Sequence, residues 1–248
     1  MRAEGASRGV GALLRRGIQS GVVRVKRRAA DLSPAELRRS RADWPLAVAA
    51  VPALGGLEGR LLSLAEPFAA DHARYCREVG HPVHAASLEL VGLIIGLVQG
   101  TAPAAVIDLG SGFTSYVLRA VAAQQAAPPL VHSVDDSREW LEKTRGYLRA
   151  QGVTEDGLFA WPDFAPERRA GQYDLVVHDM GFMDTRFETL DQVVDLAKPG
   201  GLVVLDDMHK ADYRAKALAR LADRGLVPWS LRRITHDGLT RFAYLLRR

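Results

Sequence analysis

The chain has 248 residues, of which 48% are hydrophobic and 25% are charged, a composition that suits one soluble α/β domain with additions. Its single cysteine, Cys76, excludes an internal disulfide and indicates a reducing, cytoplasmic setting. The longest apolar run, Leu90 to Val98, is too short to span a bilayer, so stable membrane insertion is not expected.

The net charge of +4 is unevenly distributed along the chain. Residues 1–45 contain eleven Lys and Arg against four acids, a net charge of +7, which leaves −3 for the remainder. A basic arm on a mildly acidic body is not the pattern of an enzyme with a basic cleft, so no nucleic-acid partner is expected. Three interpretations of the arm, residues 1–33, stay open: a solvated and partly disordered tail, a segment that touches an anionic partner or membrane surface, and an organelle presequence.

Residues 34–100 are expected to form a helical preface. Ser33 as N-cap and Pro34 in the first turn predict the start of its first helix. The three expected helices cover residues 34–43, 57–79 and 85–99. Its aromatic residues form either a lid over a substrate or part of the core: Trp44, Phe68 and Tyr75.

Residues 101–248 alternate between strand and helix patterns. Strands are expected over residues 104–109, 130–135, 157–161, 173–179 and 202–207. Helices are expected over residues 114–125, 138–150, 184–197 and 213–224. Apolar runs separated by helices predict a parallel sheet covered on both faces. Asp237 and Gly238 between two alternating runs predict a terminal hairpin, so the last strand should be antiparallel. The expected fold class is therefore α/β, with a Rossmann-like, doubly wound, mostly parallel seven-stranded sheet and an antiparallel C-terminal strand, preceded by a helical lid.

A glycine-containing loop follows the first expected strand. Asp108 ends the strand, and Gly110, Ser111 and Gly112 precede a helix. Glycines there let the backbone approach a ligand closely, and the helix N-terminus offers unpaired amides. The third glycine of a full dinucleotide fingerprint, expected near Ser115, is absent, which disfavours NAD. A tight structural turn is the alternative.

An acid closes the second expected strand, some twenty residues after the glycines. The carboxylate of Asp135 is placed to accept hydrogen bonds from both ribose hydroxyls of a nucleoside. Asp136 and Ser137 follow, so the sequence leaves open which acid makes the contact. The alternative is a helix N-cap, which Ser137 alone could supply.

Three further acids end the fourth and fifth expected strands: Asp179, Asp206 and Asp207. If these strands are neighbours, the carboxylates lie close together and repel unless protons or a cation compensate them. The sequence offers no nearby Arg motif, and Lys210 is the only adjacent cation before Arg214. We therefore expect a hard divalent ion such as Mg²⁺. The alternative is that Asp179 faces a cofactor while the Asp pair caps the next helix.

Three residues are candidates for a general base. His209 directly follows the acids and has an unperturbed pKa near neutrality. Lys210 would need a lowered pKa, and Asp184 is the third choice.

Three segments resemble the class I S-adenosylmethionine-dependent methyltransferases: VIDLGSGFTS, HSVDDSREWLEKT and YDLVVHDMGFMDTRFETLDQVVDLAKPGGLVVLDDMHK. The resemblance covers about residues 85–248 and is greatest to the metal-dependent O-methyltransferases of the catechol and macrocin types. A parallel sheet closed by an antiparallel hairpin is also the usual ending of this family, and not of NAD-binding domains.

The resemblance implies roles for the residues described above. It implies that Asp108, Gly110 and Gly112 line the methionine end of S-adenosyl-L-methionine, with Ser111 in the same loop, and that Asp135 holds the ribose. It implies that Asp163 and its neighbour Phe164, in the WPDF loop, lie near the adenine, and that Asp179, Asp206 and Asp207 bind the metal.

The chain also departs from the catechol branch. That branch usually has Asp-Asn after the fifth strand and a lysine shortly after the strand-four Asp, whereas this chain has Asp206-Asp207 and Met180-Gly181-Phe182. The identity of the base is therefore left open.

The expected function is methyl transfer to a hydroxyl of a small molecule, from secondary metabolism, assisted by a divalent metal, in a protein that can form a homo-oligomer. The alternatives are a metal-independent N- or C-methyltransferase on the same fold, a non-catalytic cofactor-binding or scaffold protein, and a hydroxylase-like divergence.

Overall fold

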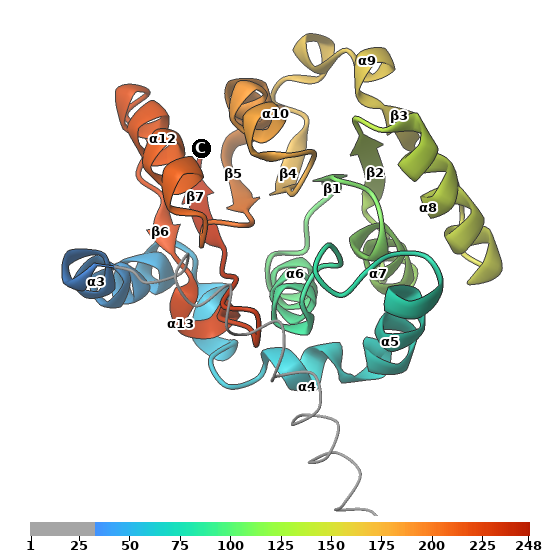
Figure 1. Cartoon of the computed structure of the whole chain (residues 1–248), viewed down its shortest axis with the longest axis horizontal. Helices are drawn as coiled ribbons and strands as arrows, with labels where there is room; N and C mark the ends of the chain where they lie inside the picture. Colours follow the sequence, from blue (N-terminus) through green and yellow to red (C-terminus); the bar gives the residue numbers. More distant parts are fainter. Residues whose placement is uncertain (1–32) are drawn as a thin grey trace, which may run out of the picture.

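The computed structural model describes residues 33–248 (Figure 1). The predicted basic arm, except Ser33, lies outside the described residues. Within the described part of the chain, no helix is long and apolar enough to cross a membrane.

A seven-stranded sheet forms the centre of the fold, with the strand order β3-β2-β1-β4-β5-β7-β6. The strands are β1 (Ala105–Leu109), β2 (Leu130–Asp135), β3 (Leu158–Ala160), β4 (Tyr173–His178), β5 (Ala197–Leu205), β6 (Trp229–Ser230) and β7 (Tyr244–Arg247). β1 to β5 pair in parallel, and β7 is antiparallel to both β5 and β6. The predicted α/β sheet, with its antiparallel end, is confirmed.

Helices cover both faces of the sheet (Figure 1). Those of the preface are α3 (Pro34–Ala50), η1 (Pro52–Gly56), α4 (Leu61–Ala65), η2 (Glu66–Phe68), α5 (Ala69–Glu78) and α6 (Leu88–Thr101). Those between and after the strands are α7 (Phe113–Ala122), α8 (Arg138–Ala150), α9 (Trp161–Phe164), η3 (Pro166–Arg169), α10 (Met183–Glu188), α11 (Leu190–Leu196), α12 (Ala211–Asp223) and α13 (Arg232–Thr235).

Alternate side chains of each strand enter two separate cores. On β1, Val106 joins the core formed with the preface and α7, whereas Ile107 and Leu109 join the core formed with α11 and α12. All five residues of β1 are buried, as expected for a central strand covered on both faces. The preface therefore shares a core with the sheet, which fixes its loops over one edge of the sheet.

The preface departs from the predicted helices. The first helix begins as predicted, with a capping box between Ser33 and Glu36, but it continues to Ala50. The helix predicted over residues 57–79 is instead α4, η2 and α5, because Pro67 cannot donate a backbone hydrogen bond and the chain switches to a 3₁₀ turn there.

The predicted terminal hairpin is wrong in its detail. Only two residues form β6 and four form β7, and α13 lies between them. The carboxylate of Asp237 accepts hydrogen bonds from the amides of Leu239 and Arg241, at 2.9 Å and 2.7 Å. Because this side chain organises a longer loop, Asp237 and Gly238 do not form a two-residue turn.

The contact of α6 with α4 yields a test of the preface packing. A Cβ on Gly92 would lie 2.1 Å from the backbone oxygen of Leu61, so Gly92→Ala should destabilise the protein by about 1–3 kcal/mol. The matched control is Gly146→Ala on α8, where a Cβ meets nothing within 4 Å, and it should stabilise the fold by about 0.5–1 kcal/mol. Urea unfolding of both variants checks this, and equal effects would contradict the described packing.

Candidate active site

A cavity of about 510 Å³ opens at the carboxyl ends of the parallel strands, the edge where ligands bind in α/β sheets. Three parts of the chain form its wall: the loops after β1 and β2, the segments after β4 and β5, and the loop between α5 and α6. The lining residues include Tyr75, His81, Val83, His84, Ala85, Gly110, Ser111, Gly112, Asp135, Asp136, Trp140, Asp179, Phe182, Met183, Arg186, Asp206, Asp207, His209, Lys210 and Arg241.

The loop after β1 is fixed against the end of β4. Gly110 has a φ of +100°, and a Cβ there would come within 2.6 Å of the Asp179 carbonyl group, so the position requires glycine. The amide of Asp179 donates a 2.7 Å hydrogen bond to the carbonyl of Leu109. On the other side, the indole Nε1 of Trp140 donates to the carbonyl of Ser111 at 2.7 Å. The loop is thus held between the end of β4 and helix α8.

Asp108 lies beneath this loop and not on the cavity wall. Its side chain is 1% exposed and accepts hydrogen bonds from the hydroxyls of Thr114, Ser115 and Ser133, at 3.1, 2.7 and 2.5 Å. Burial raises the pKa of Asp108, while Arg119 and the hydroxyls oppose that shift. The carboxylate positions the start of α7, and its predicted contact with the cofactor stays a prediction.

Asp135 and Asp136 differ in what their carboxylates contact. Asp135 is buried and accepts hydrogen bonds from the amide and hydroxyl of Ser111, at 2.8 and 2.9 Å, and from the amide of Ser137, at 2.9 Å. Asp136 is exposed, and its Oδ2 atom lies 2.9 Å from where a Cβ of Gly181 would be, across the cavity wall. Ser137 supplies the N-cap of α8, so neither acid is needed for that purpose. Which of them contacts a ribose stays a prediction.

The two residues predicted near the adenine do not line this cavity. Asp163 forms an exposed ion pair with Arg138 at 2.8 Å and lies on the wall of a second cavity, of about 360 Å³. Phe164 is 1% exposed and belongs to the core formed with α11 and α12. Their predicted contacts with an adenine stay a prediction.

The three predicted acids do meet at the cavity. β4 and β5 are neighbours, with His178 opposite Leu205, so the residues that follow both strands lie side by side. The amide of Asp206 donates to the carbonyl of His178 at 3.1 Å. Asp179, Asp206 and Asp207 all line the cavity wall.

An arginine that the sequence analysis missed compensates these acids. Arg186 on α10 is 3% exposed, and its Nη2 atom donates to Oδ1 of Asp179 at 2.7 Å and to the carbonyl of Asp179 at 2.6 Å. Its Nη1 atom lies 3.2 Å from Oδ2 of Asp207. The expectation that Lys210 is the only nearby cation is therefore wrong.

The carboxyl groups of the set differ in pKa because they differ in their neighbours. Burial raises the pKa of Asp179 to about 6, although Arg186 opposes the shift. Burial and the two other acids raise the pKa of Asp206 well above its ordinary value. Burial acts in the same direction on Asp207, but Arg186, Lys210 and His209 outweigh it and lower the pKa of Asp207. Asp207 is thus the acid held most firmly in its charged form.

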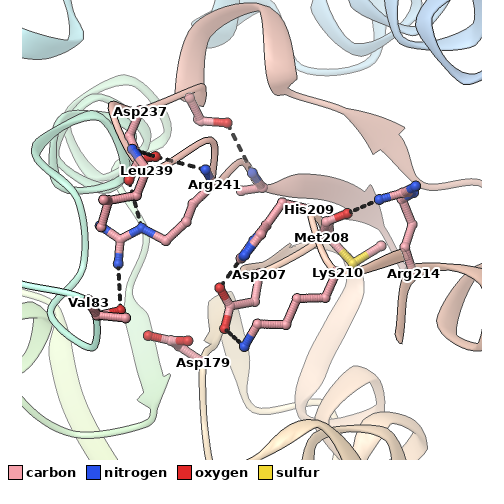
Figure 2. Close-up of polar contacts among 12 residues, drawn as sticks. Val83, Asp179, Asp207, Met208, His209, Lys210, Arg214, Asp237, Leu239 and Arg241 are labelled. Atoms are coloured by element: carbon pink, nitrogen blue, oxygen red, sulfur yellow. Dashed lines mark hydrogen bonds and ion pairs between the residues drawn. The ribbon is translucent and has the colours of Figure 1, made fainter. Parts of the chain in front are cut away.

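Two of the three candidate bases lie at the cavity (Figure 2). Figure 2 shows His209 and Lys210 directed at the carboxylate of Asp207, with Nδ1 of His209 at 3.3 Å and Nζ of Lys210 at 3.0 Å. Burial lowers the pKa of His209 to about 4, so its ring is neutral at neutral pH. Asp184 is exposed and does not line the cavity.

The preface contributes a wall that a second buried arginine holds in place. Nη1 of Arg241 donates to the carbonyls of Val83 and Ala85, at 3.2 and 2.7 Å, while its Nε donates to Asp237 at 2.6 Å (Figure 2). Of the predicted lid aromatics, only Tyr75 lines the cavity. Trp44 and Phe68 pack in the core, as the alternative interpretation had it.

Comparisons with known proteins place this arrangement in a known fold. No protein-family model and no curated protein sequence matches the chain. Solved structures do match it. The O-methyltransferase TomG from Streptomyces achromogenes, involved in tomaymycin synthesis and bound to S-adenosylmethionine, has a TM-score of 0.56 and 16% identity over 77% of this chain and 97% of its own.

Two further structures are similar. The O-methyltransferase from Bacillus cereus, in complex with S-adenosylhomocysteine, has a TM-score of 0.52 and 12% identity over 75% of this chain and 90% of its own. The S-adenosylhomocysteine-bound Podospora anserina methyltransferase PaMTH1 has a TM-score of 0.55 and 12% identity over 72% of this chain and 86% of its own. The fold is therefore that of the class I S-adenosylmethionine-dependent methyltransferases, and the resemblance found in the sequence is confirmed at the level of the fold.

The environment of His209 gives a direct prediction. Its ring should titrate near pH 4 and not near 6.5, because protonation would place a charge in a buried site beside Lys210 and Arg241. Two-dimensional NMR of the histidine rings across pH 3–8 measures this, with His209→Asn used to assign the resonance. A ring that becomes protonated between pH 6 and 7 would contradict the described burial.

Proposed function

We propose that the protein is an S-adenosylmethionine-dependent methyltransferase that methylates a hydroxyl group of a small molecule. The observation that carries this proposal is one cavity that joins the glycine loop and the acids after β2 to His209 and the acids after β4 and β5. In the fold of the class I methyltransferases, the first part suits the cofactor and the second suits the methyl acceptor. The alternatives of N- or C-methylation differ from this only in the acceptor atom.

The loop after β1 and the residues after β2 fit a nucleoside cofactor. Gly110 and Gly112 keep the wall free of side chains, and α7 begins directly after them, so its first amides face this end of the cavity. Asp136 offers an exposed carboxylate at the wall, and Trp140 a partly exposed indole ring. S-adenosylmethionine, when bound, supplies an activated methyl group, so the protein must align the acceptor with it and remove one proton.

His209 is the residue best placed to take that proton. It lines the cavity in its neutral form, and the carboxylate of Asp207, 3.3 Å from Nδ1, would stabilise the charge that protonation creates. Lys210 is engaged by the same carboxylate at 3.0 Å. The exposed position of Asp184, outside the cavity wall, disfavours it as the base.

The acceptor end has mixed walls that suit a small organic molecule. Val83, Ala85 and Met183 provide apolar surface, and Phe182 at the rim is 84% exposed and free to cover a ring or chain. The part that TomG plays in tomaymycin synthesis supports an acceptor from secondary metabolism.

The predicted Mg²⁺ does not fit the acids as they are arranged. Within the described residues, no three His, Cys, Asp or Glu side chains are grouped so that they could hold a metal ion. Arg186 already binds Asp179 and pairs with Asp207, and Lys210 also pairs with Asp207. We therefore assign no step of methyl transfer to a metal.

Cofactor binding provides the first test. S-adenosylhomocysteine should bind and NAD should not, as measured by titration calorimetry. Asp135→Ala should weaken S-adenosylhomocysteine binding by about 1.5–3 kcal/mol, because it removes charge-assisted hydrogen bonds at the ribose or the support of the Ser111 loop. Asp136→Ala, measured in parallel, shows which of the two acids contributes to the affinity for S-adenosylhomocysteine.

The control is Asp184→Ala, which alters an exposed acid outside the cavity and should leave the affinity unchanged. Tight NAD binding with no response to S-adenosylhomocysteine would overturn the proposal. Release of S-adenosylhomocysteine in the presence of hydroxylated acceptors, followed by mass analysis of the product, then identifies the methylated atom.

A further inference from the structure

We propose that Arg186 is the permanent cation of the acid set, in the place where the sequence predicted a divalent metal, so that the acceptor end of the cavity functions without one. The inference concerns the same site as the proposed methyl transfer, and its relevance to catalysis rests on that proposal. Its central claim, that the guanidinium and a metal ion compete for the same carboxylates, can be tested without any acceptor.

The guanidinium sits between two carboxylates that come from different strands. Its Nη2 contacts Asp179 after β4, at 2.7 Å, and its Nη1 lies 3.2 Å from Asp207 after β5. A metal ion that bridged these strand ends through Oδ1 of Asp179 and Oδ2 of Asp207 would have to occupy the space that the guanidinium fills. A magnesium ion needs its oxygen ligands at about 2.1 Å in near-octahedral geometry, which leaves no room for a guanidinium between the two carboxylates.

The backbone between β4 and α10 holds Arg186 in this position. Nη2 also donates to the carbonyls of Asp179 and Gly181, at 2.6 and 3.2 Å, and Nε donates to that of Met180 at 3.4 Å. The carbonyl of Arg186 itself lies 3.0 Å from Nε2 of the buried His178. A side chain with so many fixed partners cannot swing away to admit an ion.

The charges around the acids give a second, independent reason why a metal ion does not fit this site. Asp207 faces the charged side chains of Arg186 and Lys210, so its negative charge is already compensated. Arg241 adds positive charge near Asp206. A divalent ion entering this site would meet a buried guanidinium at close range, and the repulsion between like charges in a poorly solvated site is strong.

Arg186 is thus a positioning residue. Its buried side chain lies between Asp179 and Asp207 and bridges the two carboxylates, which fixes their orientation at the acceptor end. Asp207 in turn positions the ring of His209 and the ammonium of Lys210. A merely structural arginine would affect stability alone, whereas this arginine should also control whether the site can bind a metal.

The test is a titration of the full-length protein with Mn²⁺, followed by the loss of the free-ion signal in electron paramagnetic resonance. The wild-type protein should bind no Mn²⁺ at this site up to millimolar concentration. Arg186→Met removes the guanidinium, leaves the carboxylates uncompensated, and should create one Mn²⁺ site at least tenfold tighter than any in the wild type. Adding Asp179→Asn to that variant should abolish the new site.

Arg119→Met is the matched control, because it removes a buried arginine whose nearest acid is the single Asp108, and it should create no site. Wild-type protein that binds one Mn²⁺ at micromolar concentration, and loses it with Asp179→Asn, would overturn the inference. So would a folded Arg186→Met protein that gains no Mn²⁺ site.

If Arg186→Met does not fold, the wild-type titration still decides, and Arg186→Lys, which keeps a charge but has fewer donors, should bind Mn²⁺ less than tenfold better than wild type. S-adenosylhomocysteine calorimetry on the same samples separates this outcome from failure of the proposed function. Cofactor binding with no Mn²⁺ binding supports both claims, whereas absent cofactor binding affects only the proposed methyl transfer.

Discussion

The ion pairs of Arg186 with Asp179 and Asp207 determine how the rest of the cavity is built. Burying charges costs several kcal/mol per ion, and removing one partner of such a pair typically costs about 3–5 kcal/mol because the other charge is left uncompensated. The same Asp179 carries the backbone against which Gly110 packs. Asp179 therefore couples the placement of Arg186 to that of the glycine loop. As a consequence, the two ends of the cavity proposed for the acceptor and the cofactor cannot be positioned independently.

The sheet could be predicted from the sequence because its signal is local. A run such as residues 104–109, which is apolar apart from Asp108 and is followed by Gly110 and Gly112, has few other interpretations, and the structure has β1 there. The end of the chain was harder. Asp237 and Gly238 suggested a tight turn, but the Asp237 carboxylate is used by the Leu239 and Arg241 amides and by the Arg241 guanidinium. That contact depends on Arg241 bridging to the preface, more than 150 residues away in the chain.

The candidate site was likewise predictable only in part. Topology alone brings Asp179 and Asp206 together, because parallel neighbouring strands end at one edge of the sheet. The cation that compensates the negative charge of these acids was not predictable from the sequence. Arg186 lies on a helix of six residues, too short for a periodic pattern to show which of its side chains points inward. It appears in the sequence as one arginine among 33 Lys and Arg residues, and only the fold shows that it is buried. The burial of Arg241 is likewise visible only in the fold.

An arginine and a metal ion impose different requirements on a methyl acceptor. A metal with open coordination positions would bind the acceptor oxygen directly and orient it, whereas a guanidinium whose Nη2 donates to Asp179 and to neighbouring carbonyls leaves more of that task to the cavity wall. Here the wall opposite the acids is the loop at Val83 and Ala85, which Arg241 holds by both carbonyls. Acceptor orientation then depends on the docking of the preface, and selectivity should reside in this loop and in Phe182 at the rim more than in the acids. In the proposed methyl transfer, the acids and His209 would be left with the general task of removing a proton, which is the same for any hydroxyl that the wall brings into line.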